Sequence, residues 1–204
     1  MLKTLFINFE GIDGCGKDTQ IALLSKKLQQ EGYQLFNGLE PTYSFAAGIR
    51  IRKILTHELP APEPEEMQHL YFEDRKEHVD SMIAPMLRAG VTVVENRYMF
   101  STMAYGTAFG VDYDKIRSWH QGLPIPDLNF YLDIPAAEGV RRVTNNGKPE
   151  YFDKVEFLEK IDKSYKAIWQ KDEWKESVIM INGEKSIEEI HEEIWRNVKE
   201  RLAA

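Results

Sequence analysis

A glycine-rich segment near the N-terminus has the spacing of a loop that binds phosphate groups. Residues 11–17 read Gly-Ile-Asp-Gly-Cys-Gly-Lys, which fits the first seven positions of the pattern G-x-x-x-x-G-K-[ST]. In such a loop, backbone N–H groups and a helix N-terminus turn toward the β- and γ-phosphates of a nucleotide, and the lysine adds a full charge. A glycine-rich turn without a ligand is the structural alternative. The candidate nucleotide-binding residues are Gly11, Asp13, Gly14, Cys15, Gly16, Lys17, Asp18 and Thr19.

The residues on either side of this loop have the patterns of the strand and the helix that flank a phosphate-binding loop. Residues 5–9 are apolar except for Asn8 and of strand length, and residues 17–30 have helical spacing, with Ile21, Leu24 and Leu28 on one face. A strand that leads through the loop into a helix is therefore expected. One position departs from the pattern, because Asp18 follows Lys17 where a Ser or Thr hydroxyl would bind Mg²⁺.

Further along the chain, strand-length apolar runs alternate with longer helical patterns. This alternation predicts an α/β fold with a parallel sheet and helices on both faces, in one domain over residues 1–204. Ser186 to Glu189 form a capping box that opens a C-terminal helix. We expect residues 101–110, rich in Ser, Thr and Gly, to follow a strand, and the polar residues 141–150 to form a mobile loop. The expected strands are 5–9, 34–38, 91–94, 128–133 and 178–181, and the earlier helices are 17–30, 48–56, 65–88 and 153–171.

Composition excludes several classes of function. The net charge is −7 and the pI is about 5.4, so an affinity for nucleic acid is disfavoured. The single cysteine, Cys15, excludes an internal disulfide, and the five histidines show no zinc-site spacing. No apolar run approaches 18 residues, so we expect a cytoplasmic protein without a membrane segment.

Several blocks of sequence resemble the thymidylate kinase family. The resemblance implies a three-layer P-loop kinase fold with a five-stranded parallel sheet and a small lid at about residues 143–152. It also implies a homodimer that uses ATP with Mg²⁺ to phosphorylate dTMP. The blocks occur in the family's order and cover nearly the whole chain: 8–20 (Asn-Phe-Glu-Gly-Ile-Asp-Gly-Cys-Gly-Lys-Asp-Thr-Gln), 40–42 (Glu-Pro-Thr), 70–78 (Leu-Tyr-Phe-Glu-Asp-Arg-Lys-Glu-His), 96–98 (Asn-Arg-Tyr), 104–105 (Ala-Tyr), 122–127 (Gly-Leu-Pro-Ile-Pro-Asp) and 147–150 (Gly-Lys-Pro-Glu).

The resemblance also implies roles for individual residues. Lys17 and the loop amides hold ATP, and Asp13 contacts the nucleotide sugar. Tyr71 stacks on thymine, Arg75 hydrogen-bonds the base, Arg97 binds the dTMP phosphate and Tyr105 crowds the 2′ position to favour deoxyribose. Three of these assignments have structural alternatives: Tyr71 shares a helix face with core residues, Arg75 could pair with a surface acid, and Arg97 could have a purely structural role.

The departures from the family pattern fall on residues that would do chemistry. Asp18 replaces Ser or Thr, and Asn96 replaces the usual Asp before Arg97. We hypothesise an exchange, in which Asp18 takes over the acidic contact to Mg²⁺ and Asn96 supplies a neutral oxygen. Glu95 is the alternative acid, although its side chain is expected on the other face of the strand.

No arginine lies between Gly11 and Lys17, so the resemblance requires a transition-state arginine from the lid. Arg142 is the first candidate, for ATP binding and catalysis, and Arg141 and Lys148 follow, with solvated surface side chains as the alternative. An arginine in this role can contribute roughly 10³–10⁵ in rate.

The remaining departures keep other functions open. Leu39 and Gly106 stand where many family members carry an arginine and a base-contacting glutamine, and Asn146 and Tyr151 replace basic lid residues. A kinase for another nucleoside monophosphate or a nucleoside is therefore one alternative. A nucleotide-binding homologue with little catalysis is another.

Overall fold

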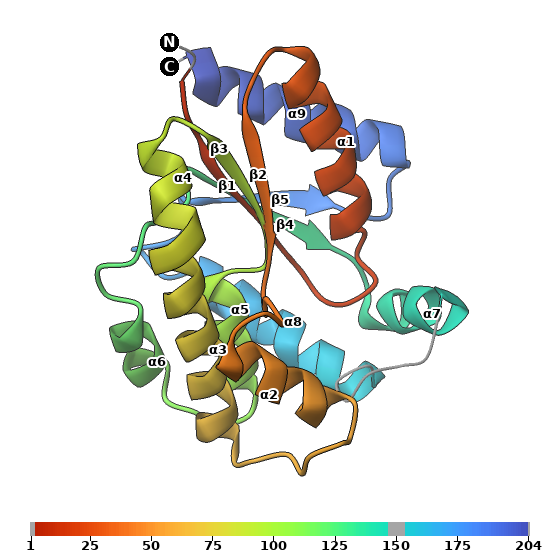
Figure 1. Ribbon diagram of the computed structural model, residues 1–204. Helices are drawn as coiled ribbons and strands as arrows, with labels where there is room; N and C mark the ends of the chain where they lie inside the picture. Colours follow the sequence, from red (N-terminus) through yellow and green to blue (C-terminus); the bar gives the residue numbers. More distant parts are fainter. Residues whose placement is uncertain (1–2, 147–153, 204) are drawn as a thin grey trace.

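The structure is a computed structural model that describes residues 3–146 and 154–203. Its centre is one parallel sheet with the strand order β2-β3-β1-β4-β5 (Figure 1). Phe9 of β1 pairs with Asn96 of β3, and Glu10 pairs with Tyr131 of β4, so the carboxyl ends of the central strands share one edge. The strands are β1 (Phe6–Glu10), β2 (Leu35–Leu39), β3 (Thr92–Asn96), β4 (Leu128–Asp133) and β5 (Val178–Asn182).

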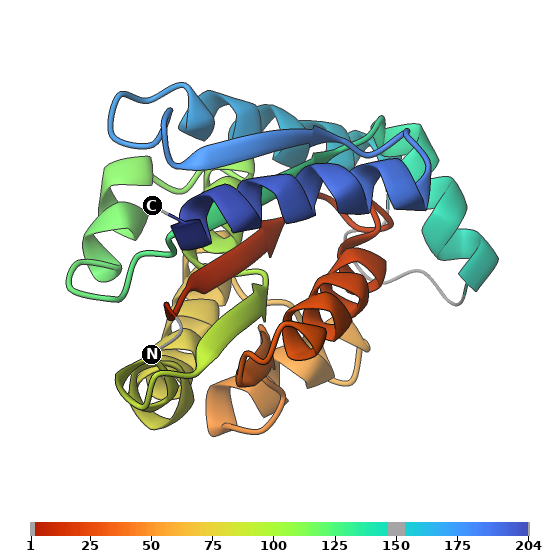
Figure 2. The ribbon, with the colours of Figure 1, turned by 90° about the horizontal axis from the view of Figure 1, so that it is seen from above.

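Helices cover both faces of the sheet, which confirms the predicted three-layer fold. Helices α1 and α9 pack together on one face, and α3, α5 and α8 lie on the other (Figures 1 and 2). The helices are α1 (Lys17–Gln30), α2 (Ala46–Leu55), α3 (Pro64–His78), the π-helical turn η1 (Val79–Ile83), α4 (Ala84–Arg88), α5 (Met99–Ala108), α6 (Tyr113–Trp119), α7 (Ala136–Asn146), α8 (Val155–Trp169) and α9 (Ile187–Ala203).

The sheet is held by a core of aliphatic and aromatic side chains from every layer. Ile7, Val94 and Leu132 on the central strands have no exposed surface, and neither do Leu24 of α1 and Ile161 of α8. A second, smaller cluster lies between α2 and α3, in which Ile51, Ile54, Leu55, Met67 and Leu70 pack together. Among the described residues, no helix combines the length and apolar character that a bilayer span requires.

The expected elements are found, with two corrections. The pattern at residues 65–88 is not one regular helix, because η1 separates α3 from α4. The Ser/Thr/Gly-rich segment follows β3 as expected and forms most of helix α5, whose Phe100 and Met103 are buried in the core. The predicted capping box forms, since Ser186 Oγ accepts from the backbone N–H of Glu189 at 3.2 Å.

The second correction concerns the segment predicted to be a mobile loop from residue 141. Residues 141–146 continue α7, whereas residues 147–153, including Lys148 and Tyr151, lie outside the described residues. Ion pairs from Glu138 to Arg141 and Arg142, three and four residues on, stabilise this helix, and Val140 packs against the core. The first part of the predicted lid, residues 143–146, is therefore helical.

Candidate active site

The glycine-rich segment forms the predicted loop between β1 and α1. Gly14 and Gly16 have φ values of 79° and 100°, in the left-handed region that glycine adopts readily. A Cβ at Gly14 would also overlap the backbone carbonyl of Gly139 in α7, which holds the loop against that helix. The side chain of Lys17 is 7% exposed and its Nζ donates to the carbonyls of Gly11 at 3.0 Å and Ile12 at 3.1 Å. The loop therefore combines the start of α1 with one buried ammonium, which is the arrangement typical of anion-binding loops.

A cavity of about 900 Å³ extends from this loop along the carboxyl edge of the sheet to α3 and α5. It brings together every predicted site residue except Gly11, which lies below the loop, where a Cβ would be 2.8 Å from the Leu132 carbonyl oxygen. The predicted residues that line it are Asp13, Gly14, Cys15, Gly16, Lys17, Asp18, Thr19, Tyr71, Arg75, Asn96, Arg97, Tyr105 and Arg142.

Arg97 stands at the centre of the cavity wall, directly after β3, with a positive φ of 70°. Its Nη2 donates to Asp13 Oδ1 at 2.5 Å and its Nη1 to Ser101 Oγ at 3.1 Å, while its guanidinium carbon lies 5.5 Å from the Tyr105 ring centroid. Burial raises the pKa of Asp13, but Arg97 and Lys17 outweigh it, so that pKa lies below its usual value and the carboxylate is charged. The guanidinium is thus held by a charged partner beside the phosphate loop.

A buried carboxylate below Arg97 orders this arrangement, and sequence reasoning gave it no role. Glu10, at the end of β1, has no exposed surface. Its Oε2 accepts from Ser101 Oγ at 2.7 Å and from the Tyr165 hydroxyl at 2.8 Å, and its Oε1 accepts from the Tyr98 N–H at 2.9 Å. Because Ser101 and Tyr165 also contact Arg97, Glu10 positions the guanidinium through them. The sequence signal that could have indicated this role is an acidic residue, Glu10, at the end of an otherwise largely apolar strand.

Arg75 forms the far end of the cavity and is only 1% exposed. Its Nε donates to Glu40 Oε2 at 2.6 Å and its Nη1 to Thr102 Oγ1 at 2.7 Å. The same Nη1 lies 2.8 Å from His120 Nε2, and burial together with Arg75 lowers the pKa of His120 to about 3. His120 is therefore neutral and accepts through Nε2, while its Nδ1 donates to the Ile116 carbonyl at 2.9 Å. The acid that pairs with Arg75 is buried, not the surface acid considered from the sequence.

Tyr71 and Gln68 line the cavity on the neighbouring turns of α3. Tyr71 is half-buried and packs against the small α2–α3 cluster, so it has both a core contact and a cavity surface. Gln68 was not singled out from the sequence. It is 2% exposed, and its Oε1 accepts no hydrogen bond from the described part of the chain. The absence of a side chain at Gly106 leaves room for Gln68, because a Cβ at position 106 would lie 3.1 Å from Gln68 Cγ and would overlap Ile116.

Asp18 and Asn96, the two departures from the pattern, are in direct contact. Asn96 Nδ2 donates to Asp18 Oδ1 at 2.6 Å, across the gap between β3 and α1. Asn96 Oδ1 is buried and, among the residues described, finds no hydrogen-bond donor. Glu95, the alternative acid, lies with His78 and Glu40 on the α3 side of the sheet. The side chains beside the phosphate loop thus offer carboxylate and amide oxygens, which suit a hard cation such as Mg²⁺.

Arg142 lies on α7 at the opposite end of the cavity from Arg75. Its Nε donates to Glu138 Oε1 at 2.6 Å, and its Nη1 and Nη2 lie 3.5 Å and 3.4 Å from the carbonyls of Gly14 and Gly183. Arg141 is exposed, donates to both carboxylate oxygens of Glu138 at 2.7 Å and is not among the described residues that line the cavity. Of the two lid arginines, Arg142 therefore reaches the phosphate loop, whereas Lys148, the third candidate, lies outside the described residues.

Together these features define a P-loop phosphotransferase, with a lysine-bearing phosphate loop and further cations that face one cavity at the carboxyl edge of a parallel sheet. The family model described as thymidylate kinase matches residues 9–194. The chain therefore belongs to the thymidylate kinase family.

Individual relatives agree with this assignment over nearly their full length. The chain is 35% identical to a thymidylate kinase of Desulfotalea psychrophila, covering 96% of this chain and 95% of the relative. It is 36% identical to a probable thymidylate kinase of Pyrococcus horikoshii, covering 98% of both chains. It is also 36% identical to a thymidylate kinase of a Synechococcus species, covering 97% of this chain and 96% of the relative.

Proposed function

We propose that the protein transfers the γ-phosphoryl group of ATP to dTMP, giving ADP and dTDP. The observation that carries this proposal is the single cavity that runs from the Lys17 loop, past Arg97, to the buried Arg75. Cations stand where two anionic nucleotides must approach each other, and positioning with charge stabilisation supplies most of the catalysis in phosphoryl transfer. In this proposal Lys17 and the loop amides bind ATP, and Arg97 binds the phosphate of dTMP.

The acceptor base would lie between Tyr71 and Arg75. Arg75 carries donors and no acceptor, so it favours the O4 carbonyl of thymine over the exocyclic amine of cytosine. The amide of Gln68 can accept from the thymine N3–H through the oxygen that has no donor among the described residues. Asp13 and Tyr105, joined by a hydrogen bond of 3.3 Å, would contact the sugar and disfavour a 2′-hydroxyl.

Mg²⁺ is implied by the use of ATP, and the residues beside the phosphate loop fit it. Asp18 and Asn96 would hold the ion through one carboxylate and the buried amide oxygen. When bound, Mg²⁺ would neutralise phosphate charge during transfer. Asp18 is exposed and can turn away from the Asn96 amide toward a cation.

We further propose that Arg142 contacts ATP. Support comes from its position between the carbonyls of Gly14, in the phosphate loop, and Gly183, after β5. The catalytic role expected from the resemblance requires the guanidinium to exchange these carbonyls for phosphate oxygens. We also propose a homodimer, supported by family membership, which size-exclusion chromatography with light scattering would test.

A coupled assay of ADP release tests the proposed acceptor. It would be run with Mg²⁺ and ATP over dTMP, dCMP, dGMP, AMP and thymidine. We expect kcat/KM to be at least tenfold higher for dTMP than for the others. A preference for another acceptor would reject dTMP as the substrate but would still support a kinase. ATP binding without ADP release from any acceptor would support the alternative of a nucleotide-binding homologue with little catalysis.

A further inference from the structure

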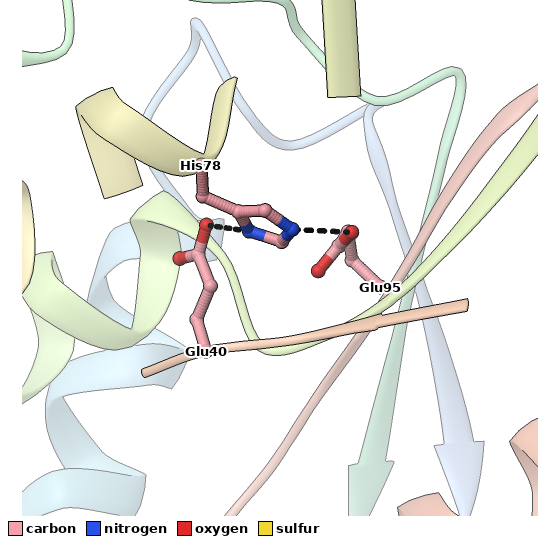
Figure 3. Close-up of side chains that lie close together, drawn as sticks. All are labelled: Glu40, His78 and Glu95. Atoms are coloured by element: carbon pink, nitrogen blue, oxygen red, sulfur yellow. Dashed lines mark hydrogen bonds and ion pairs between the residues drawn. The ribbon is translucent and has the colours of Figure 1, made fainter. Parts of the chain in front are cut away.

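The segment that joins β2 to α2 is fixed to helix α3 by three buried side chains. Arg75 Nε donates to Glu40 Oε2 at 2.6 Å, and Glu40 Oε1 lies 3.2 Å from His78 Nδ1 (Figure 3). Two residues further along the segment, Thr42 donates to Asp74 twice, from its backbone N–H to Oδ2 and from its hydroxyl to Oδ1, each at 2.7 Å. The three α3 side chains are between 1% and 4% exposed. Helix α3 therefore holds this segment at two points.

The turn after Thr42 carries a strained residue that forms part of the cavity wall. Tyr43 has a φ of 55°, in the left-handed region that a residue with a side chain seldom adopts, and it lines the cavity. Thr42 also holds the far side of this turn, because its Oγ1 accepts from the N–H of Ser44 at 3.3 Å and its carbonyl accepts from the Ser44 hydroxyl at 3.2 Å. Such a conformation costs of order 1–3 kcal/mol and persists where neighbouring contacts fix it. The contacts of Thr42 therefore set the place of the Tyr43 side chain.

Helix α2 leaves room for the carboxylate that binds Thr42. Gly48 of α2 is buried, and a Cβ at this position would overlap Asp74 Oδ1 and lie 2.9 Å from the backbone nitrogen of Tyr43. A side chain there would displace either the carboxylate or the turn. The close approach of α2 therefore specifies the position of Asp74 in addition to its two hydrogen bonds.

The contacts of Asp74 lie at the acceptor end of the cavity. Glu40, Pro41 and Tyr43 of the segment line the cavity, as does Arg75, which directly follows Asp74 in α3. The phosphate loop belongs to other elements, because it lies between β1 and α1. A shift of the segment should therefore change the acceptor site and leave the ATP site in place.

We propose that Asp74 is a positioning residue for the acceptor nucleotide. Its carboxylate fixes Thr42, which keeps Tyr43 in the cavity wall. The same contact keeps Glu40 in place to orient Arg75. This inference rests on the proposed function, because it assigns Arg75 to the acceptor base. Asp74 touches neither nucleotide and acts through the segment, so its loss should weaken dTMP binding and leave ATP binding nearly unchanged.

Two variants of Asp74 test the proposal in the coupled ADP-release assay. In Asp74→Leu both bonds to Thr42 are lost, so the KM for dTMP should rise about tenfold, with the KM for ATP changing less than threefold. Asp74→Asn keeps the shape of the side chain. Its amide oxygen can accept from the Thr42 N–H, and its amide nitrogen can donate to the Thr42 hydroxyl. The KM for dTMP of Asp74→Asn should therefore stay within about threefold of wild type.

A matched pair of threonine variants separates positioning from a loss of stability. Thr42→Val removes the hydroxyl that donates to Asp74, and Thr92→Val removes a hydroxyl that accepts from the Leu5 N–H at 3.3 Å inside the sheet. Both should lower the melting temperature, but only Thr42→Val should raise the KM for dTMP, by about 3- to 10-fold. Asp74→Leu combined with Thr42→Val should be no worse than Asp74→Leu alone, because both changes remove the same bond.

Four results would overturn the proposal. Folded Asp74→Leu could keep the wild-type KM for dTMP, or raise the KM for dTMP and the KM for ATP equally. Thr42→Val could behave as Thr92→Val does, or its effect could add to that of Asp74→Leu. If Asp74→Leu does not fold, the comparison of the two threonine variants decides alone. Wild type that does not phosphorylate dTMP rejects the proposed function instead, and the same variants, measured with the acceptor that the nucleotide panel prefers, then decide the role of Asp74.

Discussion

Replacement of Arg97 by methionine removes the cation that we place on the acceptor phosphate while keeping a side chain of similar length. In the structure the guanidinium is fixed by bonds to Asp13 at 2.5 Å and to Ser101 at 3.1 Å. Its direction is therefore set before substrate binds, so little ordering entropy opposes its contact with phosphate. The variant should lose this contact in the ground state and in the transition state.

The size of the loss follows from the kind of bond. A hydrogen bond to a charged group contributes about 1.5–3 kcal/mol, and 1.36 kcal/mol corresponds to a tenfold change in rate. Arg97→Met should therefore lower kcat/KM for dTMP by roughly 10- to 200-fold. The effect on stability should be small, about 0–1 kcal/mol, because the Asp13 side chain is 38% exposed and water can replace its partner.

Steady-state kinetics with dTMP as the varied substrate measure this effect. Arg97→Lys keeps the charge but loses the fork that reaches Asp13 and Ser101 together, so it should recover only part of the activity. Arg117→Met is the matched control, since Arg117 pairs with Glu173 on the surface of α6 and should change kcat/KM less than twofold. A kcat/KM for Arg97→Met within threefold of wild type would refute this role.

Three further outcomes are expected. Asp18→Ala and Asn96→Ala should each raise the Mg²⁺ concentration for half-maximal activity about tenfold, and an unchanged Mg²⁺ titration would contradict the proposed ligands. Gln68→Leu should raise the KM for dTMP about 2- to 10-fold without changing the KM for ATP, and equal changes in both would speak against base contact. The lowered pKa of His120 makes the folded state take up its proton later than the unfolded state as pH falls below 6.5. Wild type should therefore lose up to about 1.4 kcal/mol of stability per pH unit below 6.5 relative to His120→Gln, as measured by urea unfolding, and parallel curves would exclude this.

Local sequence patterns predicted most of the fold. Helix α1 begins at Lys17 and ends at Gln30 as expected, because its apolar stripe and the following Gly32 are local signals. Residues 141–146, the second half of α7, were misassigned as a loop, since their helical state depends on contacts between Glu138 and the two arginines and on packing of Val140. The π-helical turn after His78 has no comparable local signal.

The residues of the candidate site also fall into those that local sequence patterns indicate and those that only the folded structure brings together. The phosphate loop, Arg97 and Arg75 were accessible from residue type and spacing together with the family resemblance. Glu95, His78 and Gln68 were not, because their arrangement depends on β3, β2 and α3 meeting in space. His78 illustrates the limit: no metal-ligand spacing surrounds it in the sequence, yet the fold brings two carboxylates to its two ring nitrogens.

Isothermal titration with ATP and Mg²⁺, on wild type and on Lys17→Met, tests most directly whether the N-terminal loop binds a triphosphate. Wild type should bind ATP with one site per chain, and Lys17→Met, which removes the buried ammonium but keeps the loop glycines, should bind at least tenfold more weakly. Equal ATP affinity of the two proteins, or no binding by wild type, would contradict the assignment of this loop as the nucleotide site.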